Sequence, residues 1–319
     1  MRASCLKVTG LAWLLLLAMT SVLLAQEQGT EHLNPARPEA WTMNYFTSAT
    51  LLAGFAPPRS RPLGSTEVGI ELDWLPYLSA EERLVGFNGT TEVDTNKCPV
   101  FFRPRVTVGL PWQFALTVSY LPPFELCGVK PNLFAFALER PLYEHLPWRV
   151  GLRAYGQIGD LEGDFTCPED VVRFTPGSPQ NPQGCQGKSS DTITMRYGGL
   201  ELSGSYRIAQ AAGLTPYLGV AVNYLDTRFQ VHAQTFGFPD RRRQSADTWT
   251  FSMTAGVTYP ITERLHLSVG LFYSPLWVVR PPNTDSQNDP LFNVRTLLSY
   301  QFGPSPVPLP PGASGRQGS

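Results

Sequence analysis

Residues 248–259 read TWTFSMTAGVTY and alternate between two kinds of side chain. One face is apolar and carries Trp249, Phe251, Met253, Ala255, Val257 and Tyr259, whereas the other carries only threonine, serine and glycine. Successive side chains of a β-strand point to opposite faces, so this pattern predicts a strand with one apolar face and one small, polar face. The same alternation recurs along most of the chain and predicts an all-β protein.

Repeated alternation of this kind is typical of an antiparallel transmembrane β-barrel. The pattern marks eleven segments, at residues 44–55, 66–74, 100–110, 113–121, 131–139, 147–158, 191–208, 218–224, 248–259, 265–273 and 292–302. The connections between them alternate between short and long, as periplasmic turns and extracellular loops do. A bacterial barrel has an even number of strands, so we predict about twelve strands, with residues 84–94 as the missing one. The alternative is a ten-stranded barrel in which 44–55 is an internal plug.

The segments outside the barrel differ in composition. Residues 1–25 have basic residues, then an apolar run and a final alanine, the order of a secretory signal peptide. Residues 26–43 are expected to be a periplasmic leader and 44–302 the transmembrane barrel, while 303–319, rich in proline, glycine and serine, are expected to be a disordered tail. Within the barrel, the apolar phase of 191–208 changes near Gly198 and Gly199, which suggests a β-bulge.

The overall composition fits a barrel and excludes some partners. Hydrophobic residues make up 42% of the chain and charged residues 16%, which suits a protein that is apolar only at alternate positions. The net charge of −1 gives no indication of a nucleic-acid partner. We expect contacts with outer-membrane lipid and lipopolysaccharide, and no cofactor.

Four cysteines follow the signal peptide, and an even number in an exported chain predicts two disulfides. Val108 and Leu116 flank a tight turn centred near residue 112, and Cys98 and Cys127 are equidistant from it. Residues equidistant from a hairpin turn lie opposite each other, so this spacing predicts a Cys98–Cys127 bridge. Cys167–Cys185 would then close the connection between 159 and 190.

Charged residues on the polar faces of the strands are the candidate functional group. We predict a charge network in the lumen, formed by Glu67, Glu71, Asp73, Arg105, Arg149, Arg153, Glu201, Arg207 and Arg295. Such residues could form a charged, water-filled constriction that selects solutes. They could equally form a buried ion-pair network that fills a narrow barrel.

Two other groups of residues are weaker candidate sites. Arg241, Arg242 and Arg243 lie in a predicted extracellular loop and could bind lipopolysaccharide phosphates, although a solvated loop is the more common explanation for such a run. The four histidines show no metal-ligand spacing, and His266 with Ser268 lies near the periplasmic end of a strand. We therefore predict neither a metal site nor an enzymatic activity.

Two short motifs resemble those of known families. The ending Tyr300-Gln-Phe302 resembles the C-terminal assembly signal of Gram-negative outer-membrane proteins, which implies the assembly machinery as a partner, although 17 residues follow it here. The hairpin from Val108-Gly-Leu-Pro111 to Ser119-Tyr-Leu-Pro-Pro123 resembles one in uncharacterised outer-membrane barrel families. It is more loosely similar to hydrophobic-substrate transporters of the fatty-acid and toluene channel type, which usually have more strands and an N-terminal hatch.

Together these patterns predict a barrel in the outer membrane of a Gram-negative bacterium. A passive channel or transporter for small solutes is the first functional hypothesis, with the lumenal charges as its selectivity element. The second is a closed structural or adhesive barrel that presents disulfide-stapled extracellular loops.

Overall fold

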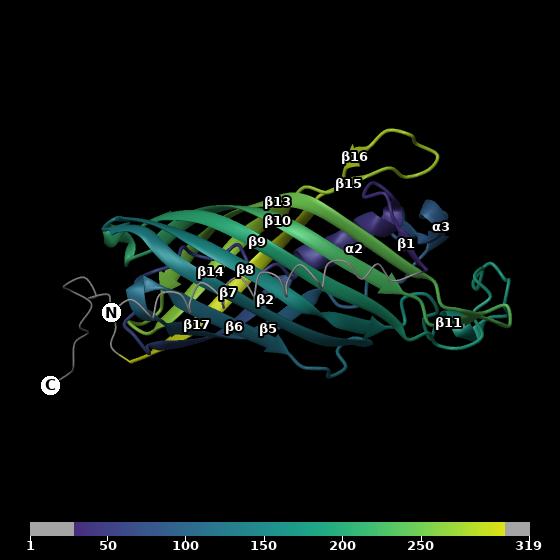
Figure 1. The fold of residues 1–319 in the computed structure, drawn as a ribbon, viewed down its shortest axis with the longest axis horizontal. Helices are drawn as coiled ribbons and strands as arrows, with labels where there is room; N and C mark the ends of the chain where they lie inside the picture. The colour runs from purple at the N-terminus through teal and green to yellow at the C-terminus, as the bar shows by residue number, and fades with distance from the viewer. Residues whose placement is uncertain (1–28, 304–319) are drawn as a thin grey trace, which may run out of the picture.

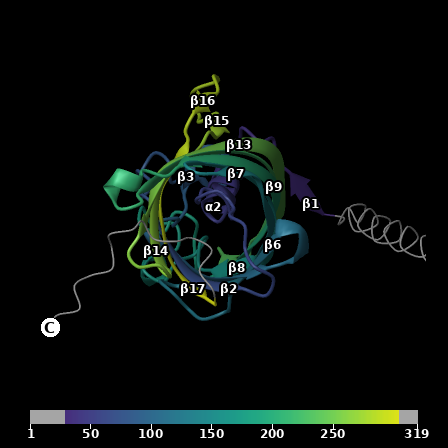
Figure 2. The same cartoon turned by 90° about the vertical axis from the view of Figure 1, so that its left-hand side faces the viewer.

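A computed structural model describes residues 29–303, and within them ten antiparallel strands close into one barrel (Figures 1 and 2). Each strand pairs with its neighbours in the chain, and β2 pairs with both β5 and the last strand, β17, which closes the sheet. The strands are β2 (Thr66–Trp74), β5 (Val100–Gly109), β6 (Ala115–Leu121), β7 (Val129–His145), β8 (Trp148–Gly163), β9 (Asp191–Tyr206), β10 (Thr215–Gln230), β13 (Arg243–Pro260), β14 (Leu265–Ser274) and β17 (Leu291–Phe302).

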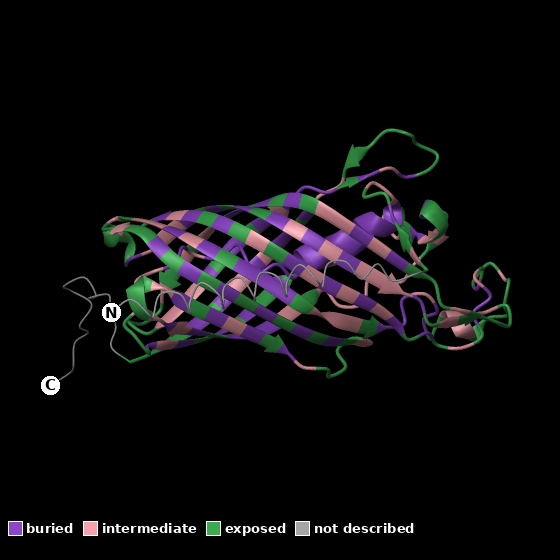
Figure 3. Cartoon of the chain, viewed as in Figure 1, coloured by how far each residue is buried: buried purple, intermediate pink, exposed green. Residues whose placement is uncertain are grey.

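The alternation of the sequence becomes alternation between the lumen and the outer surface (Figure 3). On β13, Trp249, Phe251 and Met253 are exposed on the outside of the barrel, whereas Ser252 and Thr254 are buried inside it. Hydrogen bonding around the closed sheet pairs the backbone N–H and C=O groups along most of each strand, so the outward face can be apolar without an open edge that runs the length of the barrel.

The outer surface is that of a transmembrane barrel. Apolar side chains cover its middle, and aromatic side chains gather near both ends, as they do at the two interfaces of a membrane. The exposed aromatic residues at the short-turn end include Tyr143, Trp148, Tyr206, Tyr259 and Tyr300. Those at the opposite end include Trp74, Tyr120, Trp249, Trp277 and Phe292. No helix in the part of the chain that the structure describes is long and apolar enough to span a bilayer.

The connections differ in length at the two ends of the barrel. Short ones occupy residues 110–114, 146–147, 207–214 and 261–264 at one end. Long ones occupy residues 75–99, 122–128, 164–190, 231–242 and 275–290 at the other, which we call the long-loop end. The long connections carry small hairpins: β11 (Ala233–Thr235) with β12 (Phe238–Asp240), and β15 (Trp277–Val278) with β16 (Gln287–Asn288). Single turns of 3-10 helix occur at η1 (Pro111–Gln113), η2 (Val171–Arg173) and η3 (Ala209–Ala211).

Both predicted disulfides are present at the long-loop end. The Cα atoms are 5.5 Å apart in Cys98–Cys127 and 5.6 Å apart in Cys167–Cys185. Cys98–Cys127 links the chain just before β5 to the chain just before β7, and Cys167–Cys185 closes the connection between β8 and β9.

The barrel has ten strands rather than twelve, because the two weakest predicted strands take other forms. Residues 44–55 belong to helix α2 (Pro38–Ala49) and the chain after it, which lie inside the barrel as the alternative prediction proposed (Figure 2). Residues 84–94 form a small hairpin in a long connection: β3 (Leu84–Val85), the turn α3 (Gly86–Gly89) and β4 (Thr91–Glu92). Phe87 and Asn88 have φ of 52° and 59°, left-handed values that a continuous strand does not contain.

The predicted bulge at Gly198 and Gly199 is wrong. The register of β9 with both neighbouring strands is continuous through these residues. The apolar phase changes because Ile193, Met195 and Tyr197 face inward and pack in the lumen, whereas Leu200 and Leu202 face outward. The register instead shifts on β7, between Pro141 and Tyr143.

The described part of the expected leader, residues 29–43, lies at the long-loop end. Strand β1 (Thr30–His32) pairs in parallel with the first residues of β13. This part of β13 is nearer the long-loop end than the part that pairs with β14, which starts at Met253. The chain then enters the lumen and begins α2 at Pro38, since proline is well suited to the first turn of a helix. The expected signal peptide and all of the expected tail except Gly303 lie outside the described residues.

An arginine placed on the outer face of β10 should destabilise the barrel. Val220 is 54% exposed near the middle of the strand, and an arginine at the midplane of a bilayer costs about 2–4 kcal/mol. We expect Val220→Arg to lower the free energy of unfolding by that amount in a guanidinium titration of protein folded into lipid vesicles. Gln234→Arg, in an exposed connection, is the control and should have little effect. An equal loss in both variants would contradict the assigned lipid-facing surface.

Candidate functional site

The lumen is occupied by a segment of the same chain, which we call the internal segment: residues 38–62, made up of α2 and the irregular chain after it. Helix α2 is buried along almost its whole circumference, and its side chains join those of the surrounding strands in one apolar cluster. Residues 50–62 continue to the short-turn end, where the carbonyl of Pro62 accepts a hydrogen bond from Ser65 just before β2. The internal segment therefore crosses the whole length of the barrel.

The connection between β14 and β17 holds the start of α2. The indole of Trp41 donates a 2.8 Å hydrogen bond to the carbonyl of Asp289, and the guanidinium of Arg280 lies over the Trp41 ring. Near β1, hydrogen bonds from Gln244 and Arg37 hold the pKa of Glu31 below its ordinary value. These contacts fix the point at which the chain enters the lumen.

Arg295 of β17 binds the carboxyl end of α2. Its Nη1 donates to the carbonyls of Leu51 and Ala53 at 2.6 and 2.7 Å, and its Nη2 donates to those of Ser48 and Ala49 at 3.3 Å. The last carbonyls of a helix have no partner within it and carry partial negative charge, so a buried guanidinium satisfies both needs.

Arg103 of β5 binds the same stretch of the internal segment from another side. It donates to the carbonyl of Thr50 at 2.8 Å and forms a bidentate pair with Glu71, at 3.1 and 2.8 Å. Two neighbours on the wall reinforce this contact: Tyr197 donates to the same carbonyl at 2.7 Å, and Gln157 donates to the Thr50 hydroxyl at 2.9 Å. Both side chains of the Arg103–Glu71 pair are fully buried, and each supplies the opposite charge that the other needs in the absence of water.

Arg153 of β8 forms the third contact. It pairs with Glu139 at 2.9 Å and with Glu201, and it donates to the carbonyl of Ala56 at 3.2 Å. Glu201 in turn accepts a 2.8 Å hydrogen bond from the backbone amide of Gly54. Three arginines of the wall therefore bind the internal segment: Arg295 and Arg103 between Ser48 and Ala53, and Arg153 at Ala56.

The predicted lumen residues do lie on inner faces or at the short-turn end of the lumen. Most of them pair with each other or with the internal segment. Asp73, fully buried, has its Oδ2 3.7 Å from Nε of Arg295, and neither of its oxygens accepts a hydrogen bond from a described residue. Arg149 pairs with Glu144 at 2.8 Å, outside the predicted set.

Sequence reasoning missed Arg103 and Glu139. Both have the parity of the inner face: Arg103 is two residues before Arg105, and Glu139 follows Leu133, Ala135 and Ala137 on β7. The inner positions before Glu139 are apolar because they pack in the lumenal cluster, so polarity did not distinguish the two faces of that strand.

An apolar cavity of about 110 Å³ lies beside α2, towards the long-loop end. Phe46 and Ala49 line it from the internal segment, and Phe101, Ile193 and Met195 are among the residues that line it from the wall. Its single charged lining residue among those described is Lys97, whose ammonium group pairs with Asp94 and Asp164.

The wall of the barrel is incomplete next to this cavity. The ladder between β5 and β6 runs only from Gly109 to Arg105, and β6 ends at Leu121, so β5 is unpaired on this side from Val100 to Pro104. Proline has no backbone N–H to donate, and Pro104 together with Pro122–Pro123 stands where the ladder stops. The bridge Cys98–Cys127 joins the chain on the two sides of the opening.

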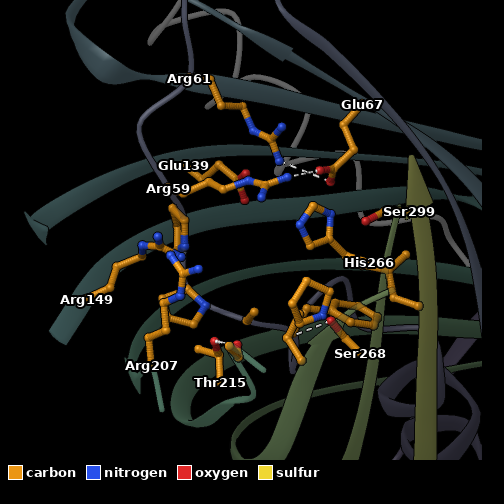
Figure 4. A pocket seen from close by; sticks show the side chains of 18 of the residues that line it. Arg59, Arg61, Glu67, Glu139, Arg149, Arg207, Thr215, His266, Ser268 and Ser299 are labelled. Carbon is orange, nitrogen blue, oxygen red and sulfur yellow. Dashed lines mark hydrogen bonds and ion pairs between the residues drawn. The ribbon is translucent and has the colours of Figure 1, made fainter. Parts of the chain in front are cut away.

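A second cavity, of about 130 Å³, lies at the short-turn end (Figure 4). Arginine side chains dominate its lining, and Glu67 and His266 contribute to it from β2 and β14. We call it the basic pocket. Five residues of the predicted lumen network line it: Glu67, Arg105, Arg149, Arg153 and Arg207.

The remaining predicted residues are at the long-loop end or in the basic pocket. Arg242 pairs with Asp240 at 2.8 Å and stacks on the ring of Phe87 at 4.4 Å, and Arg243 begins β13, while Arg241 is exposed. Contact of these arginines with lipopolysaccharide stays a prediction, as does the absence of an enzymatic activity. Among residues 29–303, no three His, Cys, Asp or Glu side chains are grouped so that they could hold a metal ion.

Comparison with known proteins does not assign the chain to a family. No family model and no curated protein matches it. Solved structures that are similar include the outer membrane protease OmpT from Escherichia coli, with 13% identity, 80% of this chain and all of that chain covered, and a TM-score of 0.37. The toluene transporter TbuX from Ralstonia pickettii has 9% identity, 86% and 95% coverage and a TM-score of 0.31. The translocator domain of the autotransporter NalP from Neisseria meningitidis has 8% identity, 77% and 91% coverage and a TM-score of 0.40.

These values are too low to transfer an activity from any of the three. The class of protein follows from the structure itself: a closed antiparallel barrel with an apolar outer band, aromatic residues at both ends, short turns at one end and long loops at the other. The chain is an outer-membrane β-barrel of a Gram-negative bacterium.

Release of α2 from the wall should open the barrel. The variant Asp73→Asn/Arg295→Met removes four hydrogen bonds to the internal segment without leaving Asp73 as an unpaired buried charge. We expect the wild-type protein to give no steady conductance in a planar bilayer, and the variant to give fluctuating openings.

Arg264→Met is the control for this measurement, because Arg264 is exposed on a short turn. It should remain as silent as the wild type. A variant that is folded, as judged by heat-modifiable migration on a gel, and yet silent would show that Arg295 does not keep the lumen closed.

Proposed function

We propose that this protein passes small apolar solutes into the outer membrane, from its long-loop end to the hydrocarbon layer through the opening beside β5. The observation that carries the proposal is the position of the apolar cavity, between the internal segment and an interrupted part of the wall. The charges of the lumen then keep the axis of the barrel closed instead of selecting ions along it.

The cavity has the chemistry of a hydrocarbon site. Its lining is apolar except for a few groups such as Lys97, which is already paired. A cavity of about 150 Å³ lined by leucine, isoleucine and phenylalanine stays dry and binds benzene, so a cavity of this size suits molecules of about one aromatic ring.

The opening lies at the depth of the lipid-facing surface. On the paired side of β5, Phe102 lies opposite Leu72 and Pro104 lies opposite Ile70. Leu72 and Ile70 are both exposed on the outer apolar surface. A solute that leaves the cavity between β5 and β7 therefore enters hydrocarbon rather than water.

The cavity also reaches the long-loop end. Cys98 and Leu126, from two of the long connections, contribute to its lining. Solute can therefore enter between these connections and leave sideways, without displacement of α2.

Filling the cavity should block this route. Met195 is fully buried and lines the cavity from β9, so we expect Met195→Trp to occupy it and to reduce uptake of radiolabelled toluene by Gram-negative cells that produce the protein. The reduction should reach the level of cells without the protein.

Leu200→Trp is the matched control, because Leu200 lies on the same strand but faces outward. It should leave uptake unchanged. Overpacking costs about 1–3 kcal/mol, so the amount of folded protein in the outer membrane must be measured for both variants. Equal uptake by cells with wild-type protein, with Met195→Trp and without the protein would overturn the proposal.

A second candidate is a closed structural or adhesive barrel. Its support is that both disulfides lie at the long-loop end and that ion pairs and hydrogen bonds fix the internal segment to the wall. This candidate requires that the cavity have no role, so uptake that depends on the protein and on Met195 would exclude it as a full account.

A further inference from the structure

We propose that the basic pocket binds a small free oxyanion, a carboxylate or a phosphate. The pocket lies at the short-turn end, away from the apolar cavity, and the proposal does not depend on the transport of apolar solutes. Six arginines line it: Arg59, Arg61, Arg105, Arg149, Arg153 and Arg207. Three glutamates line it as well: Glu67, Glu139 and Glu263.

The arginines of the internal segment are only partly neutralised. Arg59 and Arg61 share one carboxylate, that of Glu67, with Arg61 at 3.0 Å. The Nε and Nη1 atoms of Arg61 are buried and have no hydrogen-bond partner among the described residues. Buried guanidinium N–H groups without partners are costly, and an anion in the pocket would satisfy them.

Two arginines of the wall have no carboxylate partner within 4 Å in the described part of the chain. Arg105 is buried, stacks on the ring of Phe55 at 4.9 Å and leaves its Nη1 without a hydrogen bond. The side chain of Arg207, the first residue after β9, faces the same space (Figure 4). These two side chains make the pocket a positively charged one.

The other charges of the pocket nearly cancel. Arg153 binds two carboxylates, those of Glu139 and Glu201, whereas Arg149 binds the single carboxylate of Glu144. One surplus negative charge at Arg153 therefore stands against three surplus positive charges, from the Arg59–Arg61 pair, Arg105 and Arg207. Glu263 is exposed at the rim.

The opposite side of the pocket offers neutral groups. His266 and Ser299 project from β14 and β17, and Nδ1 of His266 has no partner among the described residues (Figure 4). A ring of guanidinium groups on one side and imidazole and hydroxyl groups on the other matches an oxyanion, which accepts several hydrogen bonds at once.

The test is a calorimetric titration of the refolded full chain, in non-ionic detergent and at constant ionic strength, with inorganic phosphate and, separately, with acetate. Arg207→Gln is the main variant, because no described ion pair is broken by it. We expect saturable binding of at least one anion to the wild type, weakened about tenfold in Arg207→Gln, since the variant loses a charge-assisted hydrogen bond to the anion.

Two further variants make the result specific. Thr215→Glu places a carboxylate in the pocket near Arg207 and should abolish binding while the protein remains folded. Arg264→Gln removes a positive charge outside the pocket and should leave affinity unchanged. No saturable heat with either anion in the wild type, or equal weakening in Arg207→Gln and Arg264→Gln, would overturn the proposal.

Discussion

Backbone that is not part of the wall can lie inside a membrane barrel only if its polar groups find partners. Here the partners are side chains of the wall, above all Arg295, which binds four carbonyls at the end of α2. Arg103 and Arg153 do the same for Thr50 and Ala56. The buried arginines of the lumen thus bind the internal segment. The carboxylates beside them neutralise the buried guanidinium groups.

The same constraint explains why the two cavities differ. In the half of the barrel that holds α2, the helix satisfies its own backbone, so the wall around it can be apolar and leaves an apolar cavity. In the other half the internal segment is irregular and carries Arg59 and Arg61, so the wall supplies charged residues and the cavity is basic. The proline residues that end the β5–β6 ladder then open only the apolar half to lipid.

The sequence was sufficient to predict the barrel, because each of its ten strands alternates and an outward apolar face needs no further context. It was not sufficient for α2, which is buried on all sides and therefore shows no helical period. The eleven segments that alternation marked were in fact ten strands and one internal crossing, so the rule of even strand number led to a strand at 84–94 that does not exist. The inward charges could be predicted from parity, but their partners on the internal segment could not.

The internal segment begins at the long-loop end and becomes β2 at the short-turn end, so it is threaded through a closed ring. A threaded segment that is covalently continuous with the wall at one mouth can leave only through that same mouth, with the chain that precedes it drawn down the lumen. Closure of the ring between β2 and β17, its first and last strands, must therefore take place around this segment or be followed by its passage down the lumen. The barrel of this chain therefore cannot be assembled independently of the placement of its internal segment.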